Sequence, residues 1–396
     1  MQVVKALNKP VNYIILLGFV IVLGIVYFTM TDNVAMQSML ISVSFAYVTL
    51  LFIGKIVKKT IDRKLLYIVL ASIALVFFNV TLSGPGGFDY YKKAIMFSAL
   101  LMWIAVCLFS QVSRKTVIRI YALNIIIAIL YQLFYDQGWV IIDGEIYITL
   151  NFSNPNLAGI FVMNTLLYLA IFIVAGRAVF SRLQNIINLC IAISVFIAVF
   201  GLLMLTGNRS SILSVGIFVF LVLLDIIIKK KFWLNKLFCL AVAIIPFLFI
   251  FWYVTNAGDL DMDVTLGASG EGKSNTSRNH VWVPILENFF HFFLIGDYYG
   301  ISGGTGFGQL HNTHLDVYAS YGFAVFALFI SFIYKVLRIG FMKSYDLFTR
   351  CGVYAFIATM GNSCFEASLV AGSAGFYLLT GGFLLISNYK PFNRIT

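Results

Sequence analysis

The sequence predicts an all-α, polytopic transmembrane protein of about 12 spans, and two observations carry that prediction. The first is composition: 61% of the 396 residues are hydrophobic and 11% are charged, whereas ordinary soluble domains have about 45–50% apolar and about 25% charged residues. A soluble chain of this length cannot bury so large an apolar share. The second is the recurrence of apolar runs of about 20 residues, which are long enough to cross a bilayer.

The apolar runs define the expected spans to within about four residues at each end. They are residues 11–30, 34–54, 65–82, 94–111, 117–134, 156–175, 185–206, 211–228, 236–255, 314–334, 348–365 and 372–388. No soluble domain and no low-complexity linker separates them. Residues 1–396 are therefore expected to form a single membrane domain, with one long extracytoplasmic loop at residues 256–313.

Basic residues indicate the orientation of the spans. With the N-terminus inside, 22 of the 27 Lys and Arg residues fall in inner segments, as the positive-inside rule requires of cytoplasmic loops. Both termini are therefore expected in the cytoplasm. The basic residues left outside are Lys92, Lys93, Arg209, Lys273 and Arg278. Cytoplasmic loops thus explain the net charge of +11, and no patch of interleaved basic and aromatic residues predicts a nucleic-acid partner.

The long outer loop contains every histidine of the chain except His314. Loops of this length in compact proteins are usually functional or disordered. Residues 281–295 within the loop are apolar, but about 15 residues are too few to cross a bilayer comfortably. We expect a short amphipathic or re-entrant helix there, kinked by Pro284.

The first outward-facing arginine, Arg209, lies in the turn TGNRSS at residues 206–211. A helix begins at this turn, so free backbone N–H groups and the positive end of the helix dipole favour an anion near the guanidinium. Ser210 and Ser211 would add hydrogen-bond donors. The alternative is an arginine that reaches lipid headgroups, with Ser210 as a simple N-cap.

The second outward-facing arginine, Arg278, lies in SRNHVW at residues 277–282, where the apolar segment of the loop begins. A helix start is expected here too, with Ser277 as its N-cap. The alternative is an arginine that binds lipid headgroups beside an interfacial Trp282. Taken alone, Arg278 fits this alternative better.

Three interpretations compete for His311 and His314. The first is a metal site, because the two histidines share a helical face and Asp316 follows closely. The second is structural, with Asn312 or Thr313 as N-cap of the next helix. The third is acid–base catalysis by a histidine on the outer face. Considered with the two arginines, the third gains weight, because the arginines could hold a diphosphate while a histidine removes a proton from an attacking hydroxyl.

Four motifs resemble those of the O-antigen ligase and Wzy-type polysaccharide polymerase superfamily. They are NFSNPNLAGIF (151–161), TGNRSSIL (206–213), SRNHVW (277–282) and HNTHL (311–315), in the order and spacing of that family. The resemblance covers roughly residues 150–325 and the overall helix count. The departures are mild: Asn208 and Ser210 flank the arginine where the family more often has Ser or Thr and Gly or Ala.

The resemblance implies a metal-independent glycosyltransferase without a cofactor, whose donor is a glycan linked to undecaprenyl diphosphate. Arg209 and Arg278 would bind the diphosphate as leaving group, and His311 would activate the acceptor hydroxyl. Further residues expected at the substrate site are Asn312, Asn154, Asn156, Ser210, His280 and His314. Among these, Asn312 would support the orientation of His311. His314 would lie behind the residues that contact the substrate.

The resemblance leaves the exact reaction open. A polymerase joins lipid-linked repeat units, whereas a ligase transfers the glycan to lipid A core or another acceptor, and the motifs are shared. A composition rich in Ile, Phe, Asn and Lys suggests an AT-rich genome and favours a capsule, exopolysaccharide or O-antigen polymerase of the bacterial cytoplasmic membrane, with its active site outside. A flippase or other transporter of lipid-linked oligosaccharides is the second alternative. Expected partners are the donor, a glycan acceptor, membrane lipids, a flippase and a chain-length regulator.

Overall fold

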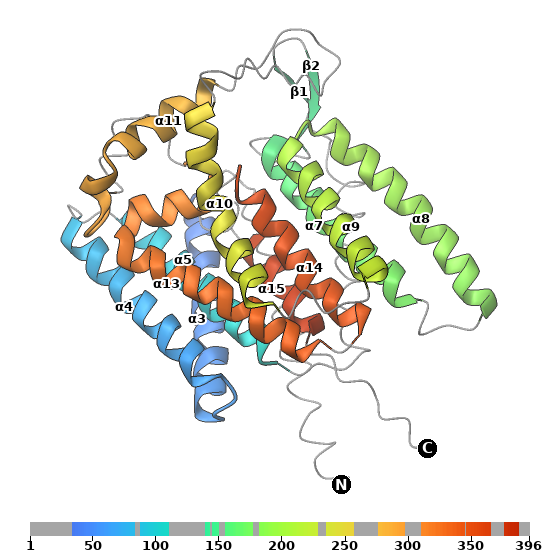
Figure 1. Cartoon of the computed structure of the whole chain (residues 1–396), viewed down its shortest axis with the longest axis horizontal. Helices are drawn as coiled ribbons and strands as arrows, with labels where there is room; N and C mark the ends of the chain where they lie inside the picture. The colour runs from blue at the N-terminus through green and yellow to red at the C-terminus, as the bar shows by residue number, and fades with distance from the viewer. Residues whose placement is uncertain are drawn as a thin grey trace.

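A computed structural model of the protein describes residues 34–83, 88–110, 139–142, 145–149, 155–176, 182–228, 235–256, 276–297, 310–344, 346–365 and 376–387. The expected spans 11–30 and 117–134, residues 257–275 of the loop, and Asn154 lie outside these ranges. The elements in chain order are α3 (Val34–Val57), α4 (Arg63–Ser83), α5 (Phe88–Leu108), β1 (Trp139–Ile142), β2 (Glu145–Ile148), α7 (Pro155–Gly176), α8 (Arg182–Leu205), α9 (Arg209–Ile228), α10 (Lys236–Asn256), α11 (Thr276–Glu287), the 3₁₀ helix η2 (Phe289–Phe292), α13 (Thr313–Lys343), α14 (Leu347–Asn362) and α15 (Phe376–Ser387) (Figure 1).

The ten expected spans that fall in the described ranges each coincide with a helix, which confirms the all-α class. Five of these helices, α4, α5, α9, α10 and α13, are long and apolar enough to cross a membrane. The short antiparallel hairpin of β1 and β2 was not expected from the sequence. The number of spans and the cytoplasmic location of both termini stay predictions.

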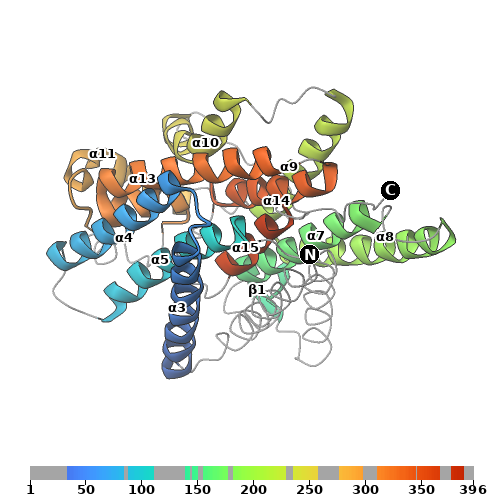
Figure 2. The same ribbon diagram turned by 90° about the horizontal axis from the view of Figure 1, so that it is seen from below.

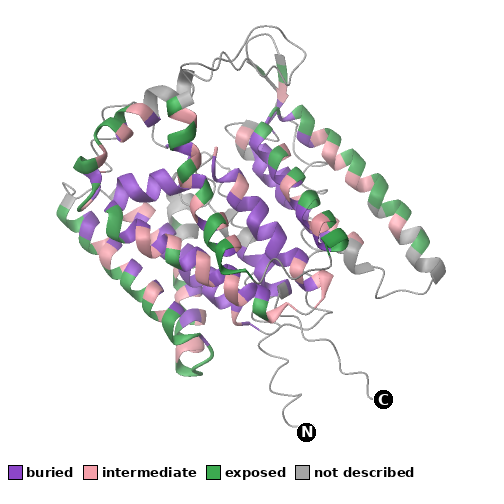
Figure 3. Cartoon of the chain, viewed as in Figure 1, coloured by how far each residue is buried: buried purple, intermediate pink, exposed green. Residues whose placement is uncertain are grey.

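Helix α5 lies at the centre of one half of the bundle, where α3, α4, α13 and α15 pack around it. Its residues from Phe97 to Leu108 are all buried. Helix α14 has the same position in the other half, between α9 and α15, whereas α8 lies at the periphery against α7 in both views (Figures 1 and 2). Buried residues accordingly gather on α14 and the start of α13, and exposed ones follow α8 (Figure 3).

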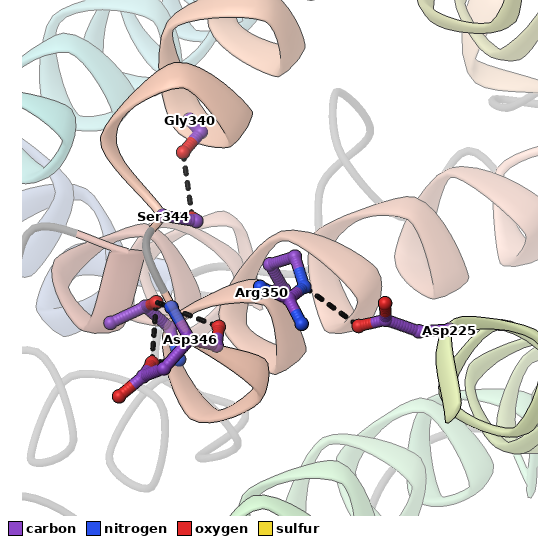
Figure 4. A network of polar contacts seen from close by, with 6 residues as sticks. Asp225, Gly340, Ser344, Asp346 and Arg350 are labelled. Carbon is purple, nitrogen blue, oxygen red and sulfur yellow. Dashed lines mark hydrogen bonds and ion pairs between the residues drawn. The ribbon is translucent and has the colours of Figure 1, made fainter. Parts of the chain in front are cut away.

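Polar contacts hold the antiparallel helices α9 and α14 together at both ends. At one end, Arg350 Nε lies 2.7 Å from Asp225 Oδ2, and the aspartate side chain is 2% exposed (Figure 4). At the other end, Asn362 Nδ2 donates to Ser210 Oγ at 3.1 Å and to Ser211 Oγ at 3.2 Å. Because the two contacts lie a helix length apart, they fix both the register and the direction of the pair.

Two lysines satisfy backbone carbonyls at the C-terminus of α5. Lys55 Nζ, from α3, donates to Phe109 O at 3.1 Å, and Lys343 Nζ, from α13, donates to Leu108 O at 2.8 Å. The last carbonyls of a helix have no partner within the helix and carry the negative end of its dipole. Lysines at this position therefore stabilise the helix end. Both lysines lie at the same end of the bundle as Arg350.

Helix α13 differs from the expected span 314–334. It continues to Lys343 and is broken at Gly322, whose φ of 80° and ψ of 173° are not helical. An unbroken helix of 31 residues would measure about 46 Å, well beyond the roughly 30 Å of a hydrocarbon core. The break separates a short first half, up to Tyr321, from a second half of ordinary spanning length.

The backbone groups released by the break are satisfied from outside α13. Asp297 N donates to Ala319 O at 2.8 Å, and Phe323 N donates to Phe293 O at 2.9 Å. Asn79 Nδ2, from α4, donates to Tyr321 O at 2.5 Å. The segment after η2 is thereby attached to the break.

The close approach at the break requires glycine on both sides. A Cβ at Gly322 would lie 2.7 Å from Leu294 O, and one at Gly296 would lie 2.5 Å from Ser320 C. Both glycines have positive φ, a conformation that side chains with a Cβ rarely adopt. Backbone therefore packs directly on backbone where residues 293–297 meet α13. These residues end the segment 276–297, which we call the outer segment after its expected side of the membrane.

The outer segment also differs in detail from the expected kinked helix at residues 281–295. Helix α11 begins earlier, at Thr276, contains Pro284 and ends at Glu287. A separate 3₁₀ turn, η2, follows. Helix α11 lies against α10 (Figure 1). The difference arises because the segment follows the surface of the bundle and turns back to reach the α13 break.

We expect Gly322→Ala to lower the free energy of unfolding by about 1–3 kcal/mol, because alanine is strained at this φ and its Cβ meets the Leu294 carbonyl. Thermal unfolding of the purified protein in detergent measures the change. Gly216→Ala is the matched control, because a Cβ at that helical glycine meets nothing within 4 Å. Equal stability of the two variants would refute the role of Gly322.

We expect Arg350→Met to destabilise the protein by about 3–5 kcal/mol, because it leaves the Asp225 carboxylate buried without its partner. The double variant Asp225→Leu/Arg350→Met removes both charges and should recover most of that loss. A double-mutant cycle of unfolding free energies tests this. Additive losses would show that the ion pair contributes nothing to the pairing of α9 and α14.

Candidate functional site

The turn TGNRSS is organised by Asn208, which caps α9. Its Oδ1 accepts hydrogen bonds from Ser211 N at 3.0 Å and from Ser210 Oγ at 2.7 Å. The alternative with Ser210 as N-cap is therefore wrong: α9 begins at Arg209, so Asn208 occupies the capping position. Arg209 is the first residue of the helix, and its side chain is exposed.

Asn208 also joins this turn to the NPN motif at the start of α7. Its Nδ2 donates to Asn156 O at 2.8 Å. A Cβ at Gly159 would lie 2.3 Å from Asn208 Cβ, so the small residue in this motif allows the two helix starts to meet. Asn156 takes part through its backbone carbonyl and its side chain is half-buried.

The end of α14 joins the turn to the motif HNTHL. Asn362 donates to Ser210 and Ser211, as described above, and the next two residues accept from the start of α13. Thr313 N donates to Ser363 O at 3.1 Å, and Asn312 Nδ2 donates to Cys364 O at 2.9 Å. Sequence reasoning missed Asn362, whose only signal was a polar Asn–Ser pair near the end of the expected span 348–365.

Asn312 is the N-cap of α13, which confirms the structural interpretation of that residue. Its Oδ1 accepts from Leu315 N at 2.9 Å, and its amide hydrogens go to Cys364 O and to Pro246 O, the latter at 3.0 Å. The side chain is 0% exposed. Asn312 therefore holds the helix start between α10 and the end of α14.

The fourth motif, SRNHVW, is joined to HNTHL through Trp282. The indole Nε1 donates to Leu310 O at 2.6 Å, and the side chain is fully buried. The expected interfacial tryptophan is therefore wrong: Trp282 packs inside, because its only polar group meets the carbonyl that precedes His311. Arg278 lies one turn before Trp282 on α11, and the side chains of Arg278 and His280 lie outside the described part of the structure.

Hydrogen bonds link Asn156, Asn208, Ser210 and Asn362, and Asn312 bonds to Cys364, two residues after Asn362. We call these residues together the polar seam. With Trp282, it ties together all four motifs, although they span residues 151–315 of the sequence. The seam lies at the end of the bundle opposite to Arg350. It brings the starts of α7, α9 and α13 to one region. Arg209 lies between Asn208 and Ser210 in the sequence, and His311 directly precedes Asn312.

The two histidines of HNTHL have different surroundings. His314 is fully buried, and its Nε2 donates to Ala243 O at 2.9 Å, which favours its role in shaping the helix start. His311 is half-buried and has a positive φ of 51°. Histidine is among the residues that tolerate this left-handed conformation, although it is uncommon outside glycine. Strained backbone of this kind is concentrated at functional sites.

A buried carboxylate lies near His311. Asp316 is 1% exposed, and it interacts electrostatically with His311 and with Lys93 of α5. Within the described ranges, no three His, Cys, Asp or Glu side chains lie together. The arrangement therefore combines an exposed cation at a helix N-terminus, which suits anion binding, with a half-buried histidine backed by a carboxylate, which suits proton transfer.

We expect Asn208→Ala to cost about 1 kcal/mol for the lost cap and a further 1–3 kcal/mol for the Asn156 carbonyl left without its donor. Asn208→Ser is the matched control, because serine caps a helix but cannot reach Asn156. Unfolding free energies should therefore rank wild type above Ser and Ser above Ala. A serine variant as stable as wild type would show that the bond to α7 is dispensable.

No protein-family model, curated protein or solved structure matches this chain.

Proposed function

We propose that the protein is a Wzy-type polysaccharide polymerase, which joins repeat units linked to undecaprenyl diphosphate on the outer face of a bacterial cytoplasmic membrane. The observation that supports this most is the polar seam. It connects the four motifs on which the family resemblance rests, from residues up to 152 positions apart in sequence. A chance set of short motifs has no reason to share one hydrogen-bonded network.

The arginines would bind the diphosphate of the donor. Arg209 is the first residue of α9 and Arg278 is the third residue of α11, so both residues lie in the first turn of a helix. Free N–H groups and the helix dipole add to the attraction for an anion at such positions. Guanidinium groups also bind phosphate oxygens in a bidentate manner.

His311 would act as general base. The acceptor hydroxyl loses its proton to the imidazole as its oxygen attacks the anomeric carbon of the donor. The bond from that carbon to the diphosphate breaks, and undecaprenyl diphosphate leaves with the electron pair, stabilised by the arginines. The lipid–diphosphate bond supplies the energy, so no nucleotide is needed outside the membrane.

A transporter of lipid-linked oligosaccharides is the second candidate, and one observation favours it. Helix α13 is discontinuous at Gly322 and holds the buried Asp316 in its first half. Broken helices with buried polar groups are common in secondary transporters. In this protein, however, the break is filled by the segment 293–297 and by Asn79, so its backbone groups already have partners.

We expect His311→Asn, Arg209→Ala and Arg278→Ala each to lower polymer formation by about 10²-fold or more. Asparagine tolerates the left-handed conformation at residue 311, so loss of activity there reflects loss of the imidazole. Lys273→Ala, in the same loop, is the control and should remain active. Polymer length on gels and lipid-linked repeats on the cell surface give the readout. Normal long-chain polymer from all three variants would refute the proposal.

Deletion of the gene separates the three candidate functions. A polymerase defect leaves single repeat units on the final acceptor. Accumulation of long chains on undecaprenyl diphosphate would instead identify a ligase, and repeats trapped on the inner face would identify a flippase. Either of the last two results would replace the polymerase assignment.

A further inference from the structure

Asp316 is a buried acid that no structural interaction explains. It lies in the short first half of α13 and its two carboxylate oxygens have no hydrogen-bond partner among the described residues. Nearly all buried polar groups in proteins are hydrogen-bonded, so exceptions call for an explanation. Burial of a carboxylate without such bonds is costly unless charges nearby compensate.

The charges that face Asp316 come from two directions. Within the described part of the chain, they are His311, at the start of α13, and Lys93, on α5. Phe97, one turn along α5 from Lys93, stacks on Tyr321 with ring centroids 5.5 Å apart, so this face of α5 packs on the first half of α13. The neighbouring helices α4 and α10 contribute the Asn79 amide and backbone carbonyls at this half-helix, which do not titrate.

The backbone explains why His311 meets this acid. The left-handed conformation of His311 is followed by an extended Asn312, with φ −151° and ψ 121°. These two residues turn the chain directly before the helix, and Asn312 is fixed there by its bonds to Pro246 and Cys364. The backbone therefore keeps His311 close to the first turns of α13.

We propose that Asp316 is a positioning residue that acts through His311: its carboxylate orients the imidazole and stabilises the imidazolium formed during glycosyl transfer, while Lys93 balances its charge. The inference rests on the function proposed above. The proton moves from the acceptor hydroxyl to His311 and later to solvent, and Asp316 neither gains nor loses one. A buried aspartate has this role behind the histidine of serine proteases.

The test uses the full-length protein in nanodiscs with the lipid-linked repeat unit as substrate. Asp316→Asn keeps the shape and breaks no hydrogen bond seen in the structure. We expect roughly a 10²-fold lower kcat with an unchanged KM. We also expect the acidic limb of the pH–rate profile to move to lower pH, because an imidazolium without its carboxylate is less stable. Asp297→Asn, on the outer segment, is the matched control and should keep the wild-type kcat.

A second variant tests the charge balance independently. In Asp316→Asn, the carboxylate no longer offsets the positive charge of Lys93, which would further destabilise the imidazolium. The double variant Asp316→Asn/Lys93→Met should therefore turn over several-fold faster than Asp316→Asn alone. If the double variant is instead slower than Asp316→Asn, the proposed charge balance is wrong.

The outcomes separate this inference from the proposed function. Wild-type kcat in Asp316→Asn, with His311→Asn inactive, overturns the role of Asp316 and leaves the polymerase proposal standing. A lower Tm and lower kcat without movement of the acidic limb would mean a structural role only, which also overturns the inference. Activity in both Asp316→Asn and His311→Asn would reject the inference and the catalytic role of His311 together.

Discussion

The break of α13 at Gly322 is the constraint on which the end of the bundle that carries the four motifs depends. A helix that stops hydrogen-bonding to itself inside an apolar bundle must find other partners for its backbone, because unsatisfied groups are costly there. Asp297, Phe293 and Asn79 provide them. The outer segment is thereby attached to the bundle, and the first half of α13 becomes a short, rigid support for HNTHL.

The polar seam likewise provides hydrogen-bond partners for backbone groups at the helix ends. Two of its amide side chains satisfy helix-terminal groups and reach a second helix: Asn208 caps α9 and binds α7, and Asn312 caps α13 and binds α10 and the end of α14. Hydrogen bonds of this kind strengthen one another where water is scarce. The seam therefore gives the candidate site a rigid base, from which Arg209 and His311 extend toward more accessible surroundings.

Charge is distributed along the bundle in a way that suits the proposed chemistry. Lys55, Lys343 and Arg350 are used at one end, where they satisfy carbonyls or Asp225. At the opposite end, the basic side chain of Arg209 is exposed at a helix start, and Lys93 lies near the buried Asp316. Cations at the first end thus have structural roles, and the exposed Arg209 is the residue that the proposed function assigns to the donor diphosphate.

The sequence by itself determined the membrane class, the extent of nearly every described helix, a cap at Asn312 or Thr313 and the four motifs, because hydropathy and capping are local signals. It could not reveal the break at Gly322, the burial of Trp282, the cap at Asn208 or the setting of Asp316. These depend on partners far away in the chain, such as Asn79 with Tyr321 and Asn362 with Ser210, at separations of 242 and 152 residues. Only tertiary packing decides which distant donor reaches an unsatisfied carbonyl, and so it alone brought the four motifs into one network.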